Sequence, residues 1–234
     1  MFGAKTLCLL LSTLLILDAQ TAHALSYDLV VIGGGSAGLT AAKFATTFGK
    51  SAVIIEKAKL GGDCTWTGCV PSKSLLKSAS VAHNARTASQ YGVNIPADQV
   101  SVDMKAVKER VKRIQERIYQ EDDSIEKLKS LGVDTIEGKA FFDSPNSLKV
   151  TKSNGQVEMV NAIEGVLIAT GAIPRKPTDQ IEGLDLIKYI TYEEVFDLDA
   201  LPARMTIVGG GPIGCELTQA FARLGSKVTQ IAER

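Results

Sequence analysis

The stretch that decides the fold is Tyr27-Asp28-Leu29-Val30-Val31-Ile32-Gly33-Gly34-Gly35-Ser36-Ala37-Gly38. Its first half is a continuous apolar run, which is typical of a strand buried inside a parallel sheet. A glycine-rich turn follows, and a helical pattern then extends through Phe48. Strand, glycine turn and helix in this order predict the first unit of a Rossmann-like α/β fold.

The glycines of this turn predict a binding site for a dinucleotide. Gly33 permits the tight turn, Gly35 lets the backbone approach a pyrophosphate, and Gly38 allows the helix to pack closely on the strand. The pyrophosphate would lie at the helix N-terminus, so Ser36 is also counted among the binding residues.

A carboxylate follows the second strand of this unit. Residues 51–55 form another apolar run, which ends in Glu56. Its distance from the glycine turn is that of an acid that holds the hydroxyl groups of a ribose. A glycine motif alone is weak evidence, but the two strands and the acid together predict dinucleotide binding.

Two cysteines stand five positions apart in Gly61-Gly62-Asp63-Cys64-Thr65-Trp66-Thr67-Gly68-Cys69-Val70-Pro71-Ser72-Lys73. This spacing lets the chain turn so that the two sulfurs meet, and Gly68 gives freedom for that turn. If residues 72–80 are helical, Cys69 lies near a helix N-terminus, which favours a thiolate, and Lys73 lies on the same face. A redox-active disulfide is one interpretation, and a static disulfide of a secreted protein is the alternative.

A long helical pattern follows the cysteines. Its charges are mixed in sign, which is typical of a solvated face, and the acidic run at 121–123 is expected to face solvent and not to bind a metal. No metal site is predicted elsewhere. The apolar positions of the pattern are Val107, Val111, Ile114, Ile118, Ile125 and Leu128.

Short strands are expected after this helix. Residues 133–136 form one strand, and residues 139–150 with 157–160 form a hairpin-like excursion around the turn at 153–155. Residues 165–168 are expected to form a separate apolar strand that closes the first sheet.

A second strand, glycine turn and helix begins at Met205, and it predicts a second dinucleotide site. The turn is Gly209-Gly210-Gly211-Pro212-Ile213-Gly214, in which Gly209, Gly211 and Gly214 take the three glycine roles. After the strand at 227–231, Ala232 occupies the position that selects between NAD and NADP, with Glu233 and Arg234 next, so the choice between the two stays open.

The first 24 residues are expected to be a signal peptide. Lys5 precedes an apolar run at 7–17, and Ala22-His23-Ala24 is a small-x-small cleavage site. The apolar run is too short for a stable membrane anchor, and Cys8 belongs to the same segment. The expected destination is the secretory pathway, the extracellular space, or an organelle reached through the secretory route.

The whole-chain charge argues for small-molecule partners. The 234 residues contain 26 basic and 26 acidic side chains, so the formal net charge is zero. A neutral chain offers no electrostatic basis for binding nucleic acid or an anionic membrane surface.

The cysteine motif resembles that of the class I pyridine nucleotide-disulfide oxidoreductases, the family that includes glutathione reductase, dihydrolipoamide dehydrogenase and mercuric reductase. The ending Cys69-Val70-Pro71-Ser72-Lys73 is most similar to mercuric reductase and its relatives. The sequence departs from the family pattern at Asp63 and at residues 65–67.

The resemblance implies FAD at the first glycine motif and NAD(P)H at the second. It implies that Cys69 faces the flavin, that Cys64 attacks the substrate, and that Lys73 pairs with Glu216 and tunes the flavin's reduction. Further FAD-binding positions implied by the family motifs are Gly62, Gly138, Ala140, Thr170 and Gly171.

The implied activity is an FAD-dependent NAD(P)H:disulfide or mercuric ion oxidoreductase that acts in cell redox homeostasis. The substrate stays open among mercuric ion, lipoamide, glutathione and other disulfides. The alternatives are a truncated, non-catalytic flavin-binding module and a secreted protein with a structural disulfide.

The resemblance also implies that this chain is part of a longer, homodimeric enzyme, because the family's later domains and its His-Glu pair have no counterpart here. The expected organisation is a signal peptide at 1–24, an FAD-binding domain with the redox disulfide at 25–175, a linker at 176–202, and an incomplete NAD(P)-binding domain at 203–234.

Overall fold

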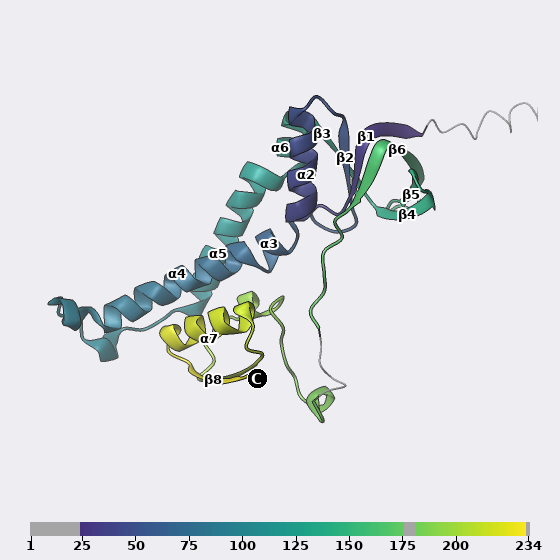
Figure 1. Ribbon diagram of the computed structural model, residues 1–234. Helices are drawn as coiled ribbons and strands as arrows, with labels where there is room; N and C mark the ends of the chain where they lie inside the picture. The colour runs from purple at the N-terminus through teal and green to yellow at the C-terminus, as the bar shows by residue number, and fades with distance from the viewer. Residues whose placement is uncertain (1–23, 176–180, 233–234) are drawn as a thin grey trace, which may run out of the picture. The chain divides into compact units, whose positions relative to one another are not determined.

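The apolar run at the start of the mature part forms β1, the central strand of a six-stranded sheet with the order β3-β2-β1-β6-β5-β4. The structure is a computed structural model that describes residues 24–175 and 181–232 (Figure 1). The strands of this sheet are β1 (Leu25–Ile32), β2 (Ala52–Glu56), β3 (Val133–Glu137), β4 (Lys139–Ser144), β5 (Ser147–Thr151) and β6 (Val157–Ile168). The predicted signal peptide, apart from Ala24, lies outside the described residues, as do Glu233 and Arg234.

The described residues divide into two compact units. The first contains residues 24–59 and 128–169, and the second contains residues 60–127, 170–175 and 181–232. The cysteine segment therefore clusters with the second glycine motif, whereas the first glycine motif lies in the other unit. In the described part of the chain, no helix combines the length and the apolar character that crossing a membrane requires.

The first unit is built on parallel strands, as the sequence predicts. β3, β2, β1 and β6 run parallel, and β5 and β4 continue the sheet in antiparallel pairs. Helix α2 (Ser36–Thr47) packs against β1, β2 and β3. The apolar core of this unit consists of Val30, Val53, Ile55, Ile136, Leu148, Val150, Val160 and Ala162. The predicted Rossmann-like α/β class is confirmed.

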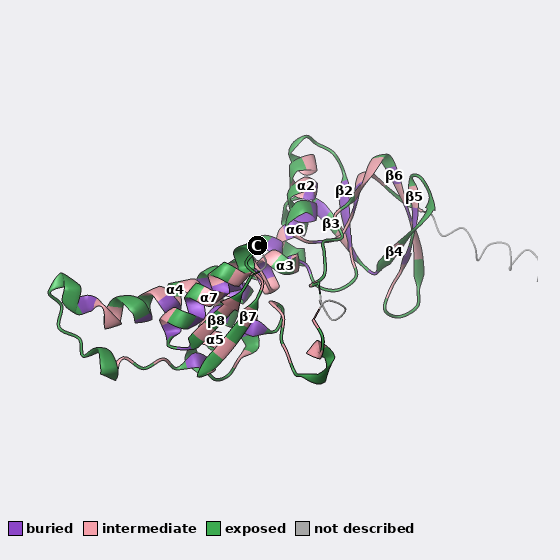
Figure 2. Cartoon of the chain, turned by 60° about the horizontal axis from the view of Figure 1, so that its bottom comes forward, coloured by how far each residue is buried: buried purple, intermediate pink, exposed green. Residues whose placement is uncertain are grey.

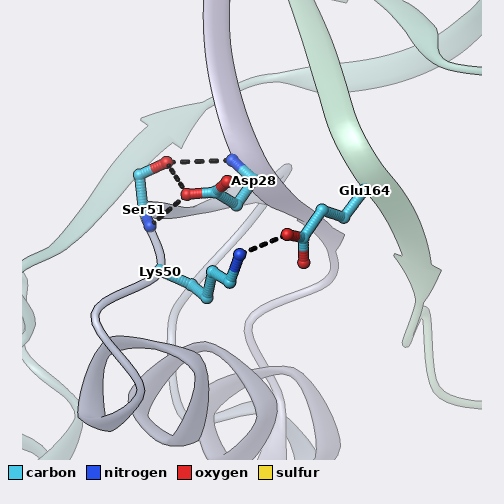
Figure 3. A network of polar contacts seen from close by, with 4 residues as sticks. All are labelled: Asp28, Lys50, Ser51 and Glu164. Atoms are coloured by element: carbon cyan, nitrogen blue, oxygen red, sulfur yellow. Dashed lines mark hydrogen bonds and ion pairs between the residues drawn. The ribbon is translucent and has the colours of Figure 1, made fainter.

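Polar contacts at the start of β1 and β2 set the register of these strands (Figure 3). Asp28 accepts hydrogen bonds from the Ser51 N–H at 2.8 Å and from the Ser51 hydroxyl at 2.7 Å, and its own N–H donates to Ser51 Oγ at 2.9 Å. These hydrogen bonds from Ser51 lower the pKa of the Asp28 carboxyl. They hold the register in which Leu29 lies opposite Ala52.

The predicted hairpin around the turn at 153–155 is confirmed by the antiparallel pairing of β5 with β6. The prediction that 157–160 and 165–168 are separate strands is wrong. Both belong to β6, a single strand of 12 residues that pairs with β5 on one side and with β1 on the other. The polar residues that interrupt the apolar pattern do not end the strand, because Glu164 lies at the surface and forms an ion pair with Lys50 (Figure 3).

The second unit contains α3 (Gly62–Trp66), α4 (Cys69–Arg86), α5 (Met104–Ile118), β7 (Arg204–Val208), α7 (Pro212–Leu224) and β8 (Lys227–Ile231). Helices α4, α5 and α7 pack around one apolar core. Strands β7 and β8 are parallel. Buried residues gather on α4 and α7 beneath exposed outer faces (Figure 2). The core consists of Leu75, Ala79, Met104, Val195, Phe196, Leu217, Ala220, Phe221 and Leu224.

Two details of the second unit differ from the sequence predictions. Helix α4 begins at Cys69 and extends to Arg86, beyond the predicted range of 72–80 at both ends. The expected linker contributes to the core, because Val195 and Phe196 are buried in a short 3-10 helix (Val195–Asp197).

The predicted long helix is interrupted. After α5, a π-helical turn (Tyr119–Asp123) leads into α6 (Ile125–Ser130). The expectation that the acidic run faces solvent is wrong for Asp123, which is only 7% exposed. Its carboxylate is buried because it accepts a hydrogen bond from the Thr65 hydroxyl at 2.7 Å.

Candidate functional site

Cys64 and Cys69 lie on two helices that meet end to end. Cys64 is in the middle of the short helix α3, and Cys69 is the first residue of α4. Gly68 joins the helices, although not through the left-handed conformation, since its φ is −122°. The chain instead approaches itself closely there, and a Cβ at position 68 would lie 2.8 Å from the backbone oxygen of Asp63.

The two cysteines are thiols in hydrogen-bond contact. Cys64 is half-buried and Cys69 is exposed. The hydrogen bond to Cys64 and partial burial raise the pKa of Cys69, while Lys73 lowers it by a smaller amount. The net direction is opposite to that expected from the helix N-terminus, because the hydrogen bond to Cys64 and burial both favour the protonated thiol.

Lys73 lies one turn along α4 from Cys69 and forms an ion pair with α7. Its Nζ is 2.5 Å from Glu216 Oε1, and both side chains are partly exposed. The structure therefore brings together the lysine and the glutamate that the family resemblance pairs. Since the core of the second unit packs α4 against α7, the pair lies at one end of a continuous helix–helix contact.

The residues that contact and orient α3 were not predicted from the sequence. Gln115 of α5 donates to the backbone oxygens of Thr65 at 3.1 Å and of Trp66 at 2.7 Å. Asp123 accepts from the Thr65 hydroxyl, and the Trp66 ring packs on Tyr119 with a centroid separation of 5.5 Å. One signal was available, because Gln115 is a polar residue four positions after Val111 on the apolar stripe.

The first glycine turn has the shape that a dinucleotide site requires. Gly33 takes a φ of 107°, and a Cβ on Gly38 would lie 1.9 Å from the Gly33 oxygen, so α2 starts directly against the turn. Gly35 is the N-cap of α2 and Ser36 its first residue. These residues leave the N-terminus of the helix close to the end of β1, where a pyrophosphate fits.

Glu56 lies against this turn. Its carboxylate accepts a hydrogen bond from the Gly34 N–H at 2.6 Å and another from the Ala58 N–H at 2.8 Å. The backbone oxygen of Glu56 accepts from the N–H of Gly138, which is buried, and half-buried Ala140 follows. The acid and the Gly138 segment therefore lie beside each other at the ends of β2 and β3.

The remaining predicted FAD positions lie in the second unit. Gly62 is the first residue of α3. Thr170 and Gly171 follow Ala169, whose N–H donates to the Ile32 oxygen at 2.8 Å.

The second glycine turn repeats the geometry of the first. Gly209 takes a φ of 126°, and a Cβ on Gly214 would lie 2.3 Å from the Gly209 oxygen. Gly211 is the N-cap of α7, which has Pro212 as its first residue. Both turns therefore need glycine where the helix begins, because any side chain would meet the backbone of the turn.

Ala232 lies beside this second turn. A Cβ on Gly210 would lie 2.6 Å from the Ala232 Cβ. Gln230 Nε2 donates to the Gly209 oxygen at 2.9 Å, a contact that the sequence did not predict. Across the described residues, no three His, Cys, Asp or Glu side chains are gathered as a metal ion would need.

Comparisons with known proteins agree with this geometry. The pattern of the pyridine nucleotide-disulphide oxidoreductase family matches residues 27–234. A dihydrolipoyl dehydrogenase of Bacillus subtilis (strain 168) is 36% identical over 204 residues, which are 87% of this chain and 43% of the relative. A mercuric reductase of Streptomyces lividans is 36% identical over 212 residues, which are 87% of this chain and 42% of the relative.

A solved structure of a flavoprotein disulfide reductase is also similar to this chain. It is the Cu(II) complex of a cysteine-to-serine mutant of the HOCl-induced flavoprotein disulfide reductase RclA from Escherichia coli. The TM-score is 0.71 at 27% sequence identity, over 88% of this chain and 42% of that one. The chain thus spans less than half the length of the relatives that it matches.

Proposed function

Because the chain belongs to the pyridine nucleotide-disulphide oxidoreductase family, we propose that it forms the dithiol- and nucleotide-bearing part of an FAD-dependent oxidoreductase. The enzyme would take electrons from NAD(P)H and deliver them to a disulfide or to mercuric ion, and it would act as a homodimer. The observation that carries the proposal is the contact between the thiols of Cys64 and Cys69, one helical turn from the Lys73–Glu216 ion pair.

The first glycine turn fits FAD. Gly33, Gly35 and Gly38 would let the pyrophosphate approach the N-terminus of α2, and Glu56 would hold the ribose hydroxyls. Gly138 and Ala140, which lie beside Glu56, would line the adenine through backbone atoms. The bound flavin would supply the step that the chain cannot perform, which is to accept a hydride and pass on two electrons.

The two cysteines would have separate roles in the exchange. Cys64 would attack the substrate disulfide as a thiolate, form a mixed disulfide and release one substrate thiolate. Cys69 would then attack the Cys64 sulfur as a thiolate, close the Cys64–Cys69 bond and release the second substrate thiolate. Lys73, held by Glu216, would place a positive charge near Cys69 and favour its thiolate. The second glycine turn, through Gly209, Gly211 and Gly214, would bind NAD(P)H.

The substrate and the nucleotide preference are finer proposals. Relatives named dihydrolipoyl dehydrogenase and mercuric reductase support either a small disulfide or mercuric ion as the acceptor. Ala232 carries no acid that would hold a ribose hydroxyl pair, and it lies beside the glycine turn at Gly210. We therefore favour NADPH over NADH.

We further propose that residues 1–24 direct the protein into the secretory route. β1 begins at Leu25, directly after the predicted cleavage site, so removal of the leader would leave the sheet intact. Sequencing the N-terminus of the protein from its own cells should find Leu25, whereas an N-terminus at Met1 would contradict this proposal.

The test of the function is electron delivery to the cysteines. The full chain is oxidised, loaded with FAD and given NADPH or NADH without oxygen, and exposed thiols are then alkylated and located by mass spectrometry. New alkylation at Cys64 and Cys69 is expected only when FAD and a reduced nicotinamide are both present. A second sample, in which light reduces the bound FAD, separates electron transfer from nicotinamide binding.

Two outcomes would contradict the function. Cysteines that stay oxidised while the bound flavin is reduced would show that the pair is a static disulfide. Cysteines that become reduced equally well without FAD would show that the flavin has no part in the transfer. Lipoamide and glutathione disulfide, added in turn to the reduced sample, identify a disulfide acceptor by the loss of the new thiols. Mercuric ion binds thiols without oxidising them, so its reduction is followed by the release of elemental mercury.

A further inference from the structure

We propose that Thr65, Gln115 and Asp123 are positioning residues that hold the Cys64 helix, α3, so that the Cys64 sulfur stays within reach of Cys69. The proposal rests on the proposed function in that it assigns the two thiols to one disulfide. Helix α3 has five residues, and a helix of this length is not stable without outside contacts. Its orientation, and with it that of Cys64, must come from the elements that touch it.

The first contact is a cap on the end of α3. The last backbone oxygens of a helix have no partner inside the helix. Gln115, which is 8% exposed, donates through Nε2 to two of them, Thr65 O and Trp66 O. A side chain of α5 thus satisfies the two residues that follow Cys64.

The second contact is a buried hydrogen bond to a carboxylate. Thr65 is 3% exposed, and its hydroxyl donates to Asp123 Oδ2 at 2.7 Å. Hydrogen bonds to charged acceptors are stronger than those between neutral groups. The π-helical turn, a form that is frequent at functional sites, brings Asp123 to this position.

An aromatic contact lies between the two polar ones. Gln115, Tyr119 and Asp123 follow one another at intervals of four residues along α5 and its π-helical turn, and each touches α3. Trp66 packs on Tyr119 and donates through Nε1 to the Leu60 oxygen at 2.7 Å.

Holding α3 should determine how readily the disulfide closes. Two thiols that are held in a reactive geometry have a high effective concentration relative to each other, which favours the disulfide. This effective concentration falls when one of the thiols can move freely. Loss of the Thr65 or Gln115 contact should therefore favour the dithiol over the disulfide. Other regions of the second unit should be unaffected.

The experiment measures the thiol–disulfide equilibrium of the full chain with glutathione. One dithiol and one glutathione disulfide give one Cys64–Cys69 disulfide and two glutathione molecules, which carry away the two thiol protons and the two electrons. Cys8 and Cys215 are replaced by Ser in every sample, so that only this pair reacts. No flavin is needed for the measurement.

Thr65→Val should lower the equilibrium constant for disulfide formation about tenfold, which is a shift of about 30 mV towards a more oxidising potential. Thr65→Ser keeps the hydroxyl and should stay within about twofold of the wild type. Gln115→Met keeps a good helix former but removes the cap, and it should show a fall of similar size. It also provides a second test should the Thr65→Val chain fail to fold.

Each variant has a matched control. Thr67→Val makes the same change at the C-cap of α3, where the hydroxyl has only a 3.4 Å contact with Asp63. Gln120→Met makes the same change as Gln115→Met at an exposed position, where the amide donates to Glu116. Both controls should keep the equilibrium constant of the wild type within about twofold.

The proposal is overturned if Thr65→Val and Gln115→Met, both folded by circular dichroism, match their controls. It is also overturned if the wild-type chain forms no Cys64–Cys69 disulfide with glutathione. A failure of electrons to pass from NAD(P)H to the cysteines would sink the proposed function but leave this equilibrium intact, so the two failures are distinguishable.

Discussion

Two neighbours act on Cys69 in opposite directions. The positive charge of Lys73 favours the Cys69 thiolate, whereas the sulfur of Cys64 disfavours it and outweighs the lysine, so the pKa of Cys69 is raised. Cys69 is therefore held in the protonated thiol form more strongly than its lysine neighbour alone would suggest.

The opposing effects can be separated by substitution. Cys64→Ala removes the largest cause that raises the pKa of Cys69, so alkylation of Cys69 by iodoacetamide at neutral pH should become several-fold faster. Lys73→Met removes the cause that lowers this pKa, so alkylation should become slower and its pH profile should move to higher pH. Equal profiles for all three chains would show that neither neighbour acts on Cys69.

Gly38 provides a second test at the level of single residues. Gly38→Ala places a Cβ 1.9 Å from the Gly33 oxygen, so the turn must open. The free energy of unfolding should fall by about 1–3 kcal/mol, and FAD uptake, followed by its visible absorbance after dialysis, should be lost.

Gly165→Ala is the matched control for this change. Nothing lies within 4 Å of a Cβ at position 165, so stability should stay within about 0.5 kcal/mol and FAD uptake should be normal. Normal FAD uptake by the Gly38→Ala chain would show that the turn is not the flavin site.

At the level of elements, α4 and α7 are joined at both ends. The Lys73–Glu216 pair lies near their N-terminal ends. Near their C-terminal ends, Arg86 donates to the backbone oxygens of Arg223 at 2.6 Å and Leu224 at 3.1 Å, and to that of Val100 at 3.4 Å. Arg86 thus caps α7, whose last oxygens would otherwise lack partners.

Removing this cap should loosen the second unit. Arg86→Met leaves two part-buried oxygens of α7 without their donor, and the free energy of unfolding in urea should fall by about 2 kcal/mol. Arg113→Met, an exposed position on α5, should change it by less than about 0.5 kcal/mol. The same loss in both variants would mean that the cap contributes nothing of its own.

Sequence periodicity predicted the elements whose apolar faces are continuous. β1, β2, β3, α2, β7 and β8 lie within a few residues of their expected ranges, because each has a continuous apolar run or an apolar face. β6 was split into two, since an exposed Glu164 breaks its apolar pattern without ending the strand. The π-helical turn was not predicted, and the contact that it makes between Asp123 and Thr65 joins residues 58 positions apart.

In the candidate site, too, local motifs could be predicted from the sequence, whereas contacts between distant residues could not. The glycine turns and the cysteine pair are local motifs, and their residues could be named from the sequence. Lys73 and Glu216 could be paired only through the family resemblance, since 143 positions separate them. Gln115 gave only a weak signal, and nothing in the spacing linked Arg86 to α7.

At the level of the whole molecule, the chain contains two glycine turns of the same construction. In each, the third glycine of the motif lies against the oxygen of the first, and each is followed by a helix that packs beside its strand. The two turns belong to different units, and the dithiol belongs with the second. This organisation suits a protein that binds two dinucleotides and passes electrons to a sulfur pair.

The most direct measurement is to map the disulfides of the full chain before and after reduction. We predict a Cys64–Cys69 bond in the oxidised chain, which opens to two alkylated thiols on reduction and closes again with glutathione disulfide, while Cys215 is alkylated throughout. A bond from Cys64 or Cys69 to Cys215, or a pair that remains alkylated in both states, would contradict the assignment of Cys64 and Cys69 as a redox pair.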